Sequence, residues 1–313
     1  MGAPRTTGDG TFDGIIVVNK PSGPTSHDIV ALVRRLTGVR RVGHGGTLDP
    51  FAAGVLPVFV GRATRLVEYH MADEKAYRAV VAFGARSTTD DLDGELTPGE
   101  GRAPDRAAAE AGLGAFRGRI SQVPPDYSAV RIAGRRAYEL ARGGEKPPLQ
   151  PREVTIHQLD LLSWDASDTE RPTATLEVRC SAGTYIRALA RDLGERLGCG
   201  AYLVALTRTA SGPFRLDGSH PPDAIREAIT TGRVTDVLVP ADTGLDGFPA
   251  LTLEGDDLGA LLRGRVVRAR LDVAGPGRGD HYRVRDGTGR LVAIARVEGG
   301  RLHPEKVFLD PMA

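Results

Sequence analysis

Short segments with strand-like hydrophobic patterns are spread along most of the chain, and only a few segments have helical spacing. Residues 14–20 form an apolar run, and residues 76–84 alternate with Tyr77 on the apolar face. Residues 153–164 and 173–181 predict two strands of an antiparallel pair. Strands and helices in this irregular order favour a mixed α+β domain.

Three segments predict helices that carry basic residues. Residues 27–38 repeat apolar side chains at helical spacing and end in Thr-Gly, a stop signal. Residues 183–198 predict a helix with Tyr185 and Arg187 in its first turn. Residues 131–142, which follow a diproline turn, predict a basic amphipathic helix.

The length of 313 residues suits two domains. Glycine and proline punctuate residues 240–249, where we place the boundary. We expect a flexible tail at 1–12, a larger mixed domain at 13–243 and a small β-rich domain at 248–313. In the last of these, the turn sequence at residues 286–289 separates two alternating runs, which indicates a hairpin.

Composition excludes several classes of protein. There is no apolar run of membrane-spanning length and no apolar signal-peptide core at the start, so we expect a cytoplasmic protein with no membrane contact. Cys180 and Cys199 do not form a CxxC pair and the seven histidines are scattered, so we expect no metal and no cofactor. The acidic run at residues 90–95 lacks the spacing of a calcium loop, and we interpret it as solvated.

The distribution of charge is more informative than the net charge of +1. Only four of the 41 basic residues are lysines, and arginine is the better group for phosphates and for stacking. Residues 261–301 contain ten arginines and four acidic residues. Such an excess is typical of a nucleic-acid-binding face, although a solvated strand face has it too.

The stretch GHGGTLDP, residues 43–50, places one histidine and one aspartate among glycines. Asp49 followed by Pro50 is also the pattern of a helix start. The alternative is chemical, because a carboxylate can act as a covalent nucleophile without a cofactor when an arginine holds it ionised and aimed. The dipeptide Tyr77-Arg78 and the nearby pair Tyr185 and Arg187 provide aromatic and basic groups suited to a nucleobase and its phosphates.

Several motifs together resemble the bacterial TruB family of tRNA pseudouridine synthases. They are VNKPSGPTSHD, GHGGTLDP followed by AAGVLPV, QVPPDYSAV with AYELAR, and CSAGTYIRALARDLGERLGCGA. The resemblance covers roughly residues 13–215, and its ordered motifs are far more specific than any one of them. It implies the pseudouridine synthase fold, which is a mixed, largely antiparallel sheet flanked by helices. It also implies isomerisation of uridine 55 in the T-arm loop of tRNA. The C-terminal part is similar to a small PUA-like RNA-binding domain, of an actinobacterial type.

The resemblance also implies roles for individual residues. Asp49 matches the catalytic aspartate, Arg187 the arginine that pairs with it, and Tyr77 the tyrosine that stacks on the flipped base. Five further residues match substrate-binding positions: His44 assists flipping, Tyr185 and Leu206 line the pocket, Lys20 lies near the active site, and Arg131 belongs to an RNA-gripping insertion. Arg131 stands where many relatives have lysine, which keeps the charge but changes the geometry. Ordinary structural roles remain alternatives for Tyr77, Tyr185, Leu206 and Lys20.

The expected partner is the T-arm of tRNA, bound by a monomer that requires no protein partner. Two other functions remain open. A guide-RNA-dependent pseudouridine synthase shares the aspartate motif but works within a protein complex, and this chain has no long lysine-rich tail. A tRNA-binding or tRNA-folding module is the other possibility.

Overall fold

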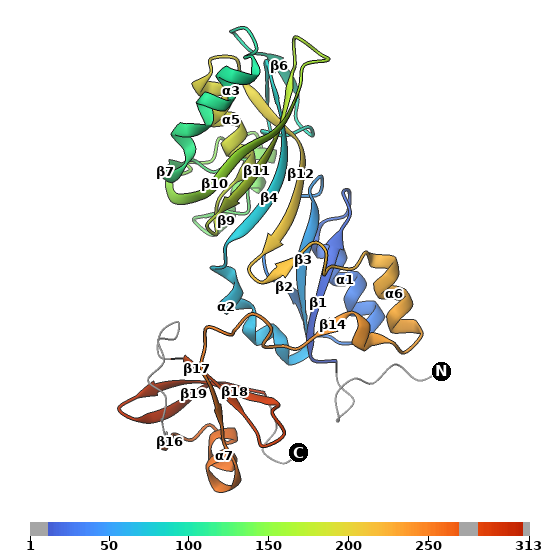
Figure 1. Ribbon diagram of the computed structural model, residues 1–313, viewed down its shortest axis with the longest axis vertical. Coiled ribbons are helices and arrows are strands. Elements are labelled where there is room, and N and C mark those ends of the chain that lie inside the picture. The colour runs from blue at the N-terminus through green and yellow to red at the C-terminus, as the bar shows by residue number, and fades with distance from the viewer. Residues whose placement is uncertain (1–11, 269–280, 309–313) are drawn as a thin grey trace.

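The computed structural model describes residues 12–268 and 281–308. Most of the tail expected at 1–12 and part of the arginine-rich segment 261–301 therefore lie outside the described residues. The described parts form a ten-stranded and a five-stranded sheet in an elongated molecule (Figure 1), together with two two-stranded pairs. No described helix is both long and apolar enough to cross a bilayer.

The large sheet has ten strands within the described residues, in the order β14-β1-β3-β12-β4-β11-β10-β7, with β2 beside β3 and β13 beside β12. In chain order these are β1 (Gly14–Lys20), β2 (Val42–His44), β3 (Ala53–Val60), β4 (Lys75–Phe83), β7 (Gly118–Gln122), β10 (Arg152–Asp165), β11 (Thr173–Cys180), β12 (Ala201–Ser211), β13 (Phe214–Arg215) and β14 (Leu238–Val239). Pairing is antiparallel except between β3 and β12, which run parallel. The mixed, largely antiparallel sheet that the family resemblance implies is confirmed.

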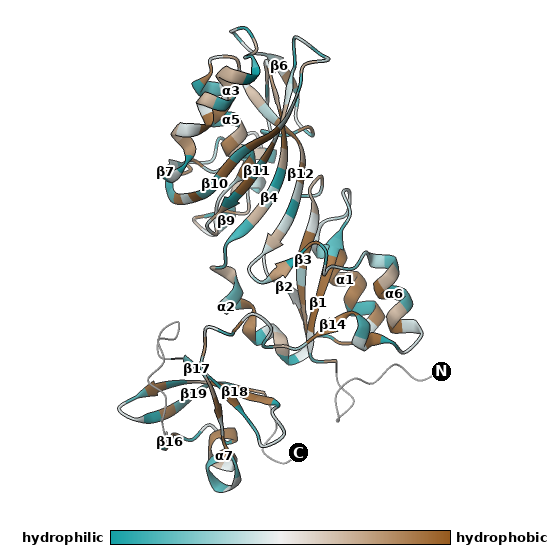
Figure 2. Ribbon diagram, viewed as in Figure 1, coloured by the Kyte–Doolittle hydropathy of each residue, from teal (hydrophilic) through white to brown (hydrophobic). Residues whose placement is uncertain are grey.

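Six described helices accompany the large sheet, and four of them cover it in two groups. The six are α1 (Ser26–Thr37), α2 (Val67–Met71), α3 (Arg106–Leu113), α4 (Ala137–Arg142), α5 (Ile186–Arg196) and α6 (Pro222–Thr230). α1 and α6 pack beside β1 and β3, whereas α3 and α5 pack on the half formed by β4, β10 and β12 (Figure 1). One core cluster spans both halves and includes Val18, Ile29, Phe83 and Leu189. Figure 2 shows apolar residues concentrated along these strands.

Both ends of α1 and the C-terminal end of α5 lie at cap and stop residues that can be seen in the sequence. Thr25 caps α1 through the backbone N–H of Asp28, and Gly38 ends it in the left-handed conformation that glycine adopts readily. α5 (Ile186–Arg196) starts three residues later than predicted, because Tyr185 is extended and precedes the helix, but it ends before Gly198 as predicted. These predictions succeed because caps and stops act through local backbone hydrogen bonds.

The helix predicted over residues 131–142 is only partly present. Residues 131–136 form a small hairpin of β8 (Arg131–Ile132) and β9 (Arg135–Arg136), and α4 begins at Ala137. The turn holds Ala133 and Gly134 at φ values of 47° and 88°, which a right-handed helix cannot contain. The Glu139 carboxylate then accepts a hydrogen bond from the Arg136 N–H and caps the shorter helix.

The small sheet has its own core. It is formed by β15 (Ala250–Thr252), β16 (Val267–Arg268), β17 (His281–Arg285), β18 (Leu291–Glu298) and β19 (Arg301–Val307), with α7 (Gly255–Leu262) packed on it. Residues 286–289 turn between β17 and β18, which confirms the predicted hairpin. A further cluster that includes Leu66, Phe248 and Ile294 joins this sheet to the larger body. We propose the domain division 13–243 and 248–313 on this basis.

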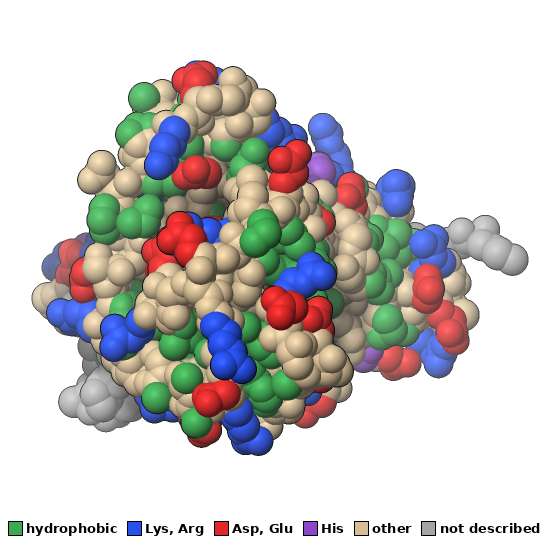
Figure 3. Space-filling view, turned by 90° about the horizontal axis from the view of Figure 1, so that it is seen from above, with side chains coloured by type: hydrophobic (Ala, Val, Ile, Leu, Met, Phe, Trp, Pro, Cys, Tyr) green, Lys and Arg blue, Asp and Glu red, His purple; other side chains and the backbone are tan. Residues whose placement is uncertain are grey.

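Minor pairs complete the fold. β5 (Ala85–Ser87) and β6 (Leu96–Pro98) form a short hairpin around the acidic loop. Figure 3 views the molecule from above Figure 1 and shows acidic and basic side chains interspersed, as a net charge of +1 leads one to expect. Charge on this face is therefore not segregated by sign.

Candidate active site

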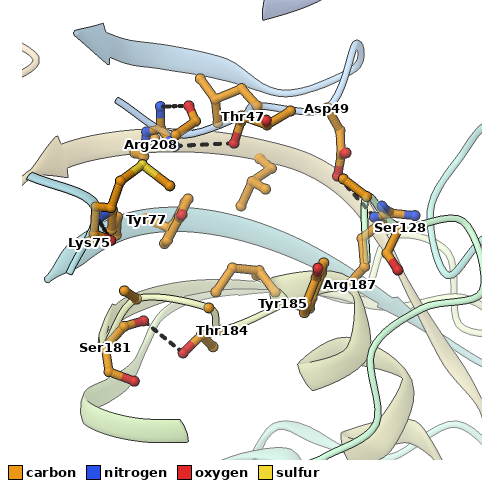
Figure 4. A pocket seen from close by; sticks show the side chains of 18 of the residues that line it. Thr47, Asp49, Lys75, Tyr77, Ser128, Ser181, Thr184, Tyr185, Arg187 and Arg208 are labelled. Carbon is orange, nitrogen blue, oxygen red and sulfur yellow. Dashed lines mark hydrogen bonds and ion pairs between the residues drawn. The ribbon is translucent and has the colours of Figure 1, made fainter. Parts of the chain in front are cut away.

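A cavity of about 290 Å³ lies where the loop before β3 faces β4, β12 and the start of α5. Its lining includes five of the residues singled out from the sequence: Asp49, Tyr77, Tyr185, Arg187 and Leu206. They come from four separate segments of the chain. Figure 4 shows Asp49 and Arg187 on one side of this space and Tyr77 and Lys75 towards the other.

Asp49 is carried by a turn. The Ala52 N–H donates to the Asp49 carbonyl at 3.1 Å, and no helix begins here, so the interpretation of Asp49 as a helix cap is wrong. The Ser26 hydroxyl accepts from the Leu48 N–H at 2.8 Å and lies 2.9 Å from the Leu48 carbonyl oxygen, to which it donates. The loop is thereby fastened to the first residue of α1.

Arg187 forms an ion pair with the Asp49 side chain. Its Nε lies 3.0 Å from Asp49 Oδ2 as an ion pair, although the N–H does not point at that oxygen. The rest of the guanidinium donates to the carbonyls of Thr89 at 3.0 Å and Tyr127 at 2.8 Å, and lies 3.3 Å from Asp91 Oδ2. Because Arg187 is buried and multiply bonded, it is a rigid partner for a half-exposed carboxylate.

The acidic run at residues 90–95 is not fully solvated, which corrects the interpretation from sequence. Asp91 is buried beside Arg187, and Asp90 pairs with Arg191 at 3.0 Å one helical turn further along α5. Burial raises the pKa of both carboxyls, for Asp90 to about 6. Two arginines of one helix face thus hold this loop against the site.

The two tyrosines and Leu206 form the apolar part of the cavity. Tyr77 and Leu206 are buried, and Tyr185 is the residue that precedes α5. Burial raises the pKa of both tyrosine hydroxyls, and the Arg208 guanidinium opposes that rise at Tyr77. These rings are neutral phenols at physiological pH and can contact a nucleobase.

His44 and Lys20 lie behind the cavity rather than in its lining. His44 ends β2, and its Nδ1 accepts from the Gly46 N–H at 3.3 Å. Burial is the main cause that lowers the pKa of His44. Lys20 is fully buried, and its Nζ donates to the carbonyls of Pro21, Pro24 and Pro50 at 2.9, 2.7 and 3.2 Å.

Arg131 is exposed on the β8–β9 hairpin and does not line either cavity at Asp49. A second cavity of about 510 Å³ opens on the other side of Asp49 and Arg187. Tyr138 lines it with the guanidinium carbons of Arg136 and Arg142 at 5.8 and 5.5 Å from its ring centre. The basic segment therefore borders the site, with its charges on a hairpin and a short helix.

The comparisons with known proteins agree with this geometry. Residues 34–186 match the TruB family pseudouridylate synthase N-terminal domain, and residues 187–246 match the tRNA pseudouridylate synthase B C-terminal domain. Proteins named tRNA pseudouridine synthase B from Thermobifida fusca and Gloeobacter violaceus are 41% and 43% identical to this chain. The first match covers 95% of this chain and 98% of the relative, and the second 94% and 98%. The chain belongs to the TruB family of pseudouridylate synthases.

Solved structures give the same fold for this TruB-family chain. A chain in the crystal structure of a Cbf5-Nop10-Gar1 complex is 25% identical, with a TM-score of 0.71 over 99% of this chain and 90% of that chain. The predicted pseudouridine synthase fold is confirmed, and the protein is an isomerase of this family.

Sequence reasoning missed two other residues of the TruB-family cavity, Lys75 and Arg208. Arg208 is 1% exposed and Lys75 is 8% exposed. Strand alternation offers a signal for Arg208, because it lies two residues after Leu206 and so shares its face of β12. Alternation offers the same signal for Lys75, which lies two residues before Tyr77 and shares its face of β4. For buried Asp91 the sequence holds no comparable signal, since its burial depends on what packs over it.

Proposed function

We propose that the protein converts uridine 55 in the T-arm loop of tRNA to pseudouridine, with Asp49 as the nucleophile. One observation carries the proposal: Asp49 is paired with a buried arginine at the wall of a cavity that Tyr77 also lines. At about 290 Å³ the cavity has the scale of a site for one small ligand. A base within folded RNA must leave its stack to enter such a space.

The chemistry assigned to each group follows from its place. Asp49 attacks the flipped nucleoside, the N1–C1′ bond breaks, and the uracil turns. C5 then bonds to C1′, and the bond to Asp49 breaks to release the free carboxylate. The C5 proton leaves and N1 gains a proton, so the product is an isomer. Attack on C1′ and attack on C6 of the base both satisfy this balance. Arg187 aims the carboxylate, and the Tyr77 ring stacks on the base and holds a neutral hydroxyl near it.

The surrounding residues supply substrate binding in this proposal. His44 supports the loop that enters the space left by the flipped base, and Tyr185 and Leu206 wall the cavity. Lys20 acts from behind, through the Pro50 carbonyl. Arg131 on its exposed hairpin binds tRNA phosphate. We further propose that the enzyme acts in the cytoplasm as a monomer, without a protein partner, and that the small sheet contacts tRNA.

The test uses unmodified tRNA transcript with tritium on C5 of its uridines, incubated with the purified protein alone. We expect tritium release by the wild type, none by Asp49→Asn, and full release by the matched control Asp217→Asn, whose side chain is exposed. A transcript with cytidine at position 55 should release none.

The outcomes separate the candidate functions. Tight tRNA binding by the wild type without tritium release would contradict the proposal and favour a binding module. Release that appears only when guide RNA and partner proteins are added would favour the guide-dependent class. Release by Asp49→Asn at the wild-type rate would exclude Asp49 as the nucleophile.

A further inference from the structure

Arg208 is a charged side chain buried in the centre of the large sheet. It is 1% exposed and is among the largest fully buried side chains of the described residues. Within the described chain no carboxylate lies within 4.0 Å of its guanidinium. Burying an uncompensated charge is costly unless hydrogen bonds replace its water, so its partners indicate what it does.

Those partners are backbone carbonyls of the segment that carries Asp49. Arg208 Nε donates to the Val55 carbonyl at 2.7 Å, and its two terminal nitrogens donate to Thr47 at 3.3 Å and Gly46 at 3.1 Å. These contacts bracket Asp49 in sequence, and Figure 4 draws two of them at Arg208, beside Thr47. A planar guanidinium can serve three carbonyls at fixed angles, which a lysine ammonium cannot match.

Arg208 is also the strand partner of Tyr77. The two residues face each other across the antiparallel pair of β12 and β4, and both line the cavity. The register of this pair shifts immediately after Arg208, between Arg208 and Ala210. Such an irregularity can re-aim a side chain.

The backbone at Arg208 is pressed against β3. Gly54 is its parallel strand partner and has φ of 101°, and a Cβ on Gly54 would lie 2.3 Å from the Arg208 carbonyl oxygen. The base of the Arg208 side chain is therefore fixed by close contact, and its far end is fixed by three carbonyls. Because both ends of the Arg208 side chain are fixed, it can hold the Asp49 loop at a defined distance from β12.

We propose that Arg208 is a positioning residue for the reaction. It fixes the position of the Asp49 turn relative to the Tyr77 hydroxyl. The inference rests on the proposed function. Asp49 is thus held from two directions: Arg187 aims its carboxylate, and Arg208 fixes the backbone that carries it. Arg208 touches no phosphate-binding surface, because it is buried, so its loss acts on the chemical step and leaves tRNA binding in place.

The experiment measures single-turnover tritium release and tRNA binding for Arg208→Met, Arg208→Lys and Arg208→Ala. The matched control is Arg215→Met, an exposed arginine of the adjoining strand β13. For Arg208→Met we expect the rate to fall about 100-fold, the effect of a displacement near 1 Å, while tRNA affinity changes by less than about 3-fold. Arg208→Lys keeps the charge but loses the planar set of N–H donors, so its rate should lie between those of the wild type and Arg208→Met.

Chemical rescue distinguishes positioning from a general loss of folding. Arg208 lines the cavity, so the space left in Arg208→Ala is open to a small cation. Millimolar guanidinium should raise the rate of Arg208→Ala several-fold and leave Arg215→Met unchanged. If Arg208→Met does not fold, the lysine variant and this rescue carry the test.

Three results would overturn the inference while the wild type remains active. The first is an unchanged rate in Arg208→Met, and the second is a loss of tRNA binding that parallels the loss of rate. The third is that guanidinium does not rescue Arg208→Ala and Arg208→Lys is as slow as Arg208→Met. An inactive wild type would instead contradict the proposed function itself, so the two failures are distinct.

Discussion

Arg187 Nε lies 3.0 Å from Asp49 Oδ2, and the arginine is the more buried partner, with its side chain 5% exposed against 36% for the aspartate. The pair thus has a fixed inner member and an accessible outer one. This arrangement suits the nucleophilic role proposed for Asp49, because a nucleophile must reach its substrate without losing its orientation.

Arg187→Lys should therefore lower the single-turnover rate by at least about 100-fold, because an ammonium cannot keep the carbonyls of Thr89 and Tyr127 and also aim Asp49. Filter binding should find tRNA affinity within about 3-fold of the wild type. The matched control is Arg196→Lys at the exposed end of α5, which should be fully active. An active Arg187→Lys would show that the aspartate is aimed by something else.

Lys20→Met should destabilise the protein by about 3 kcal/mol, because the carbonyls of Pro21, Pro24 and Pro50 lose the hydrogen bonds that the buried ammonium donates. Burial lowers the pKa of Lys20 to about 8, so at neutral pH it is still an ammonium with three N–H donors. Urea unfolding measures the change. Lys146→Met, at an exposed site, should alter the free energy of unfolding by less than about 0.5 kcal/mol; equal effects at both sites would contradict the assignment.

Asp90 should make stability depend on pH in the acidic range. Its pKa is about 6 in the folded protein and 3.8 as the ordinary value, so the folded state binds the proton more tightly. The stability contributed by protonation is fully present below about pH 4 and is lost as pH rises through about 6. Relative to Asp90→Asn, the unfolding free energy of the wild type should fall by up to about 3 kcal/mol between about pH 4 and pH 7.

Denaturant titrations of both proteins across that range give the comparison. A difference that grows in favour of the wild type as pH rises would mean that Arg191 keeps Asp90 ionised and that burial is the weaker effect.

Arg131→Gln should weaken tRNA binding and reduce the slope of log affinity against log salt by about 1, since one phosphate contact is lost. The rate at saturating tRNA should not change, because Arg131 is exposed on a hairpin outside the cavity. Arg226→Gln on the exposed face of α6 is the control. An unaltered salt slope in Arg131→Gln would remove this residue from the RNA contact.

Local signals in the sequence predicted the elements that local interactions determine. The alternation around Tyr77 and the glycine stop after α5 are examples. The helix over residues 131–142 was extended too far, because Ala133 adopts a positive φ that no side-chain pattern reveals. The sheet order also had to come from the structure, since the parallel contact of β3 and β12 joins segments far apart in the chain.

The residues of the candidate site also fall into those that the sequence marked and those that it did not. Asp49, Tyr77 and Arg187 were found because the family resemblance marked them, and the structure places them around one cavity. Arg208 and Asp91 were missed, because a charged residue in a strand or an acidic loop is exposed in most proteins. Here both are buried by segments that approach from elsewhere in the chain.

The position of β12 also bears on how the enzyme is made. β12 is synthesised late but lies between β3 and β4, so it alone joins the half of the sheet that carries Asp49 to the half that holds Arg187. A nascent chain that stops before Ala201 contains Asp49, Tyr77 and Arg187, yet its two half-sheets have no strand to unite them. Such fragments should be inactive and expose unpaired strand edges, which favours aggregation. We therefore expect no catalytic competence before β12 has been synthesised as far as Ser211.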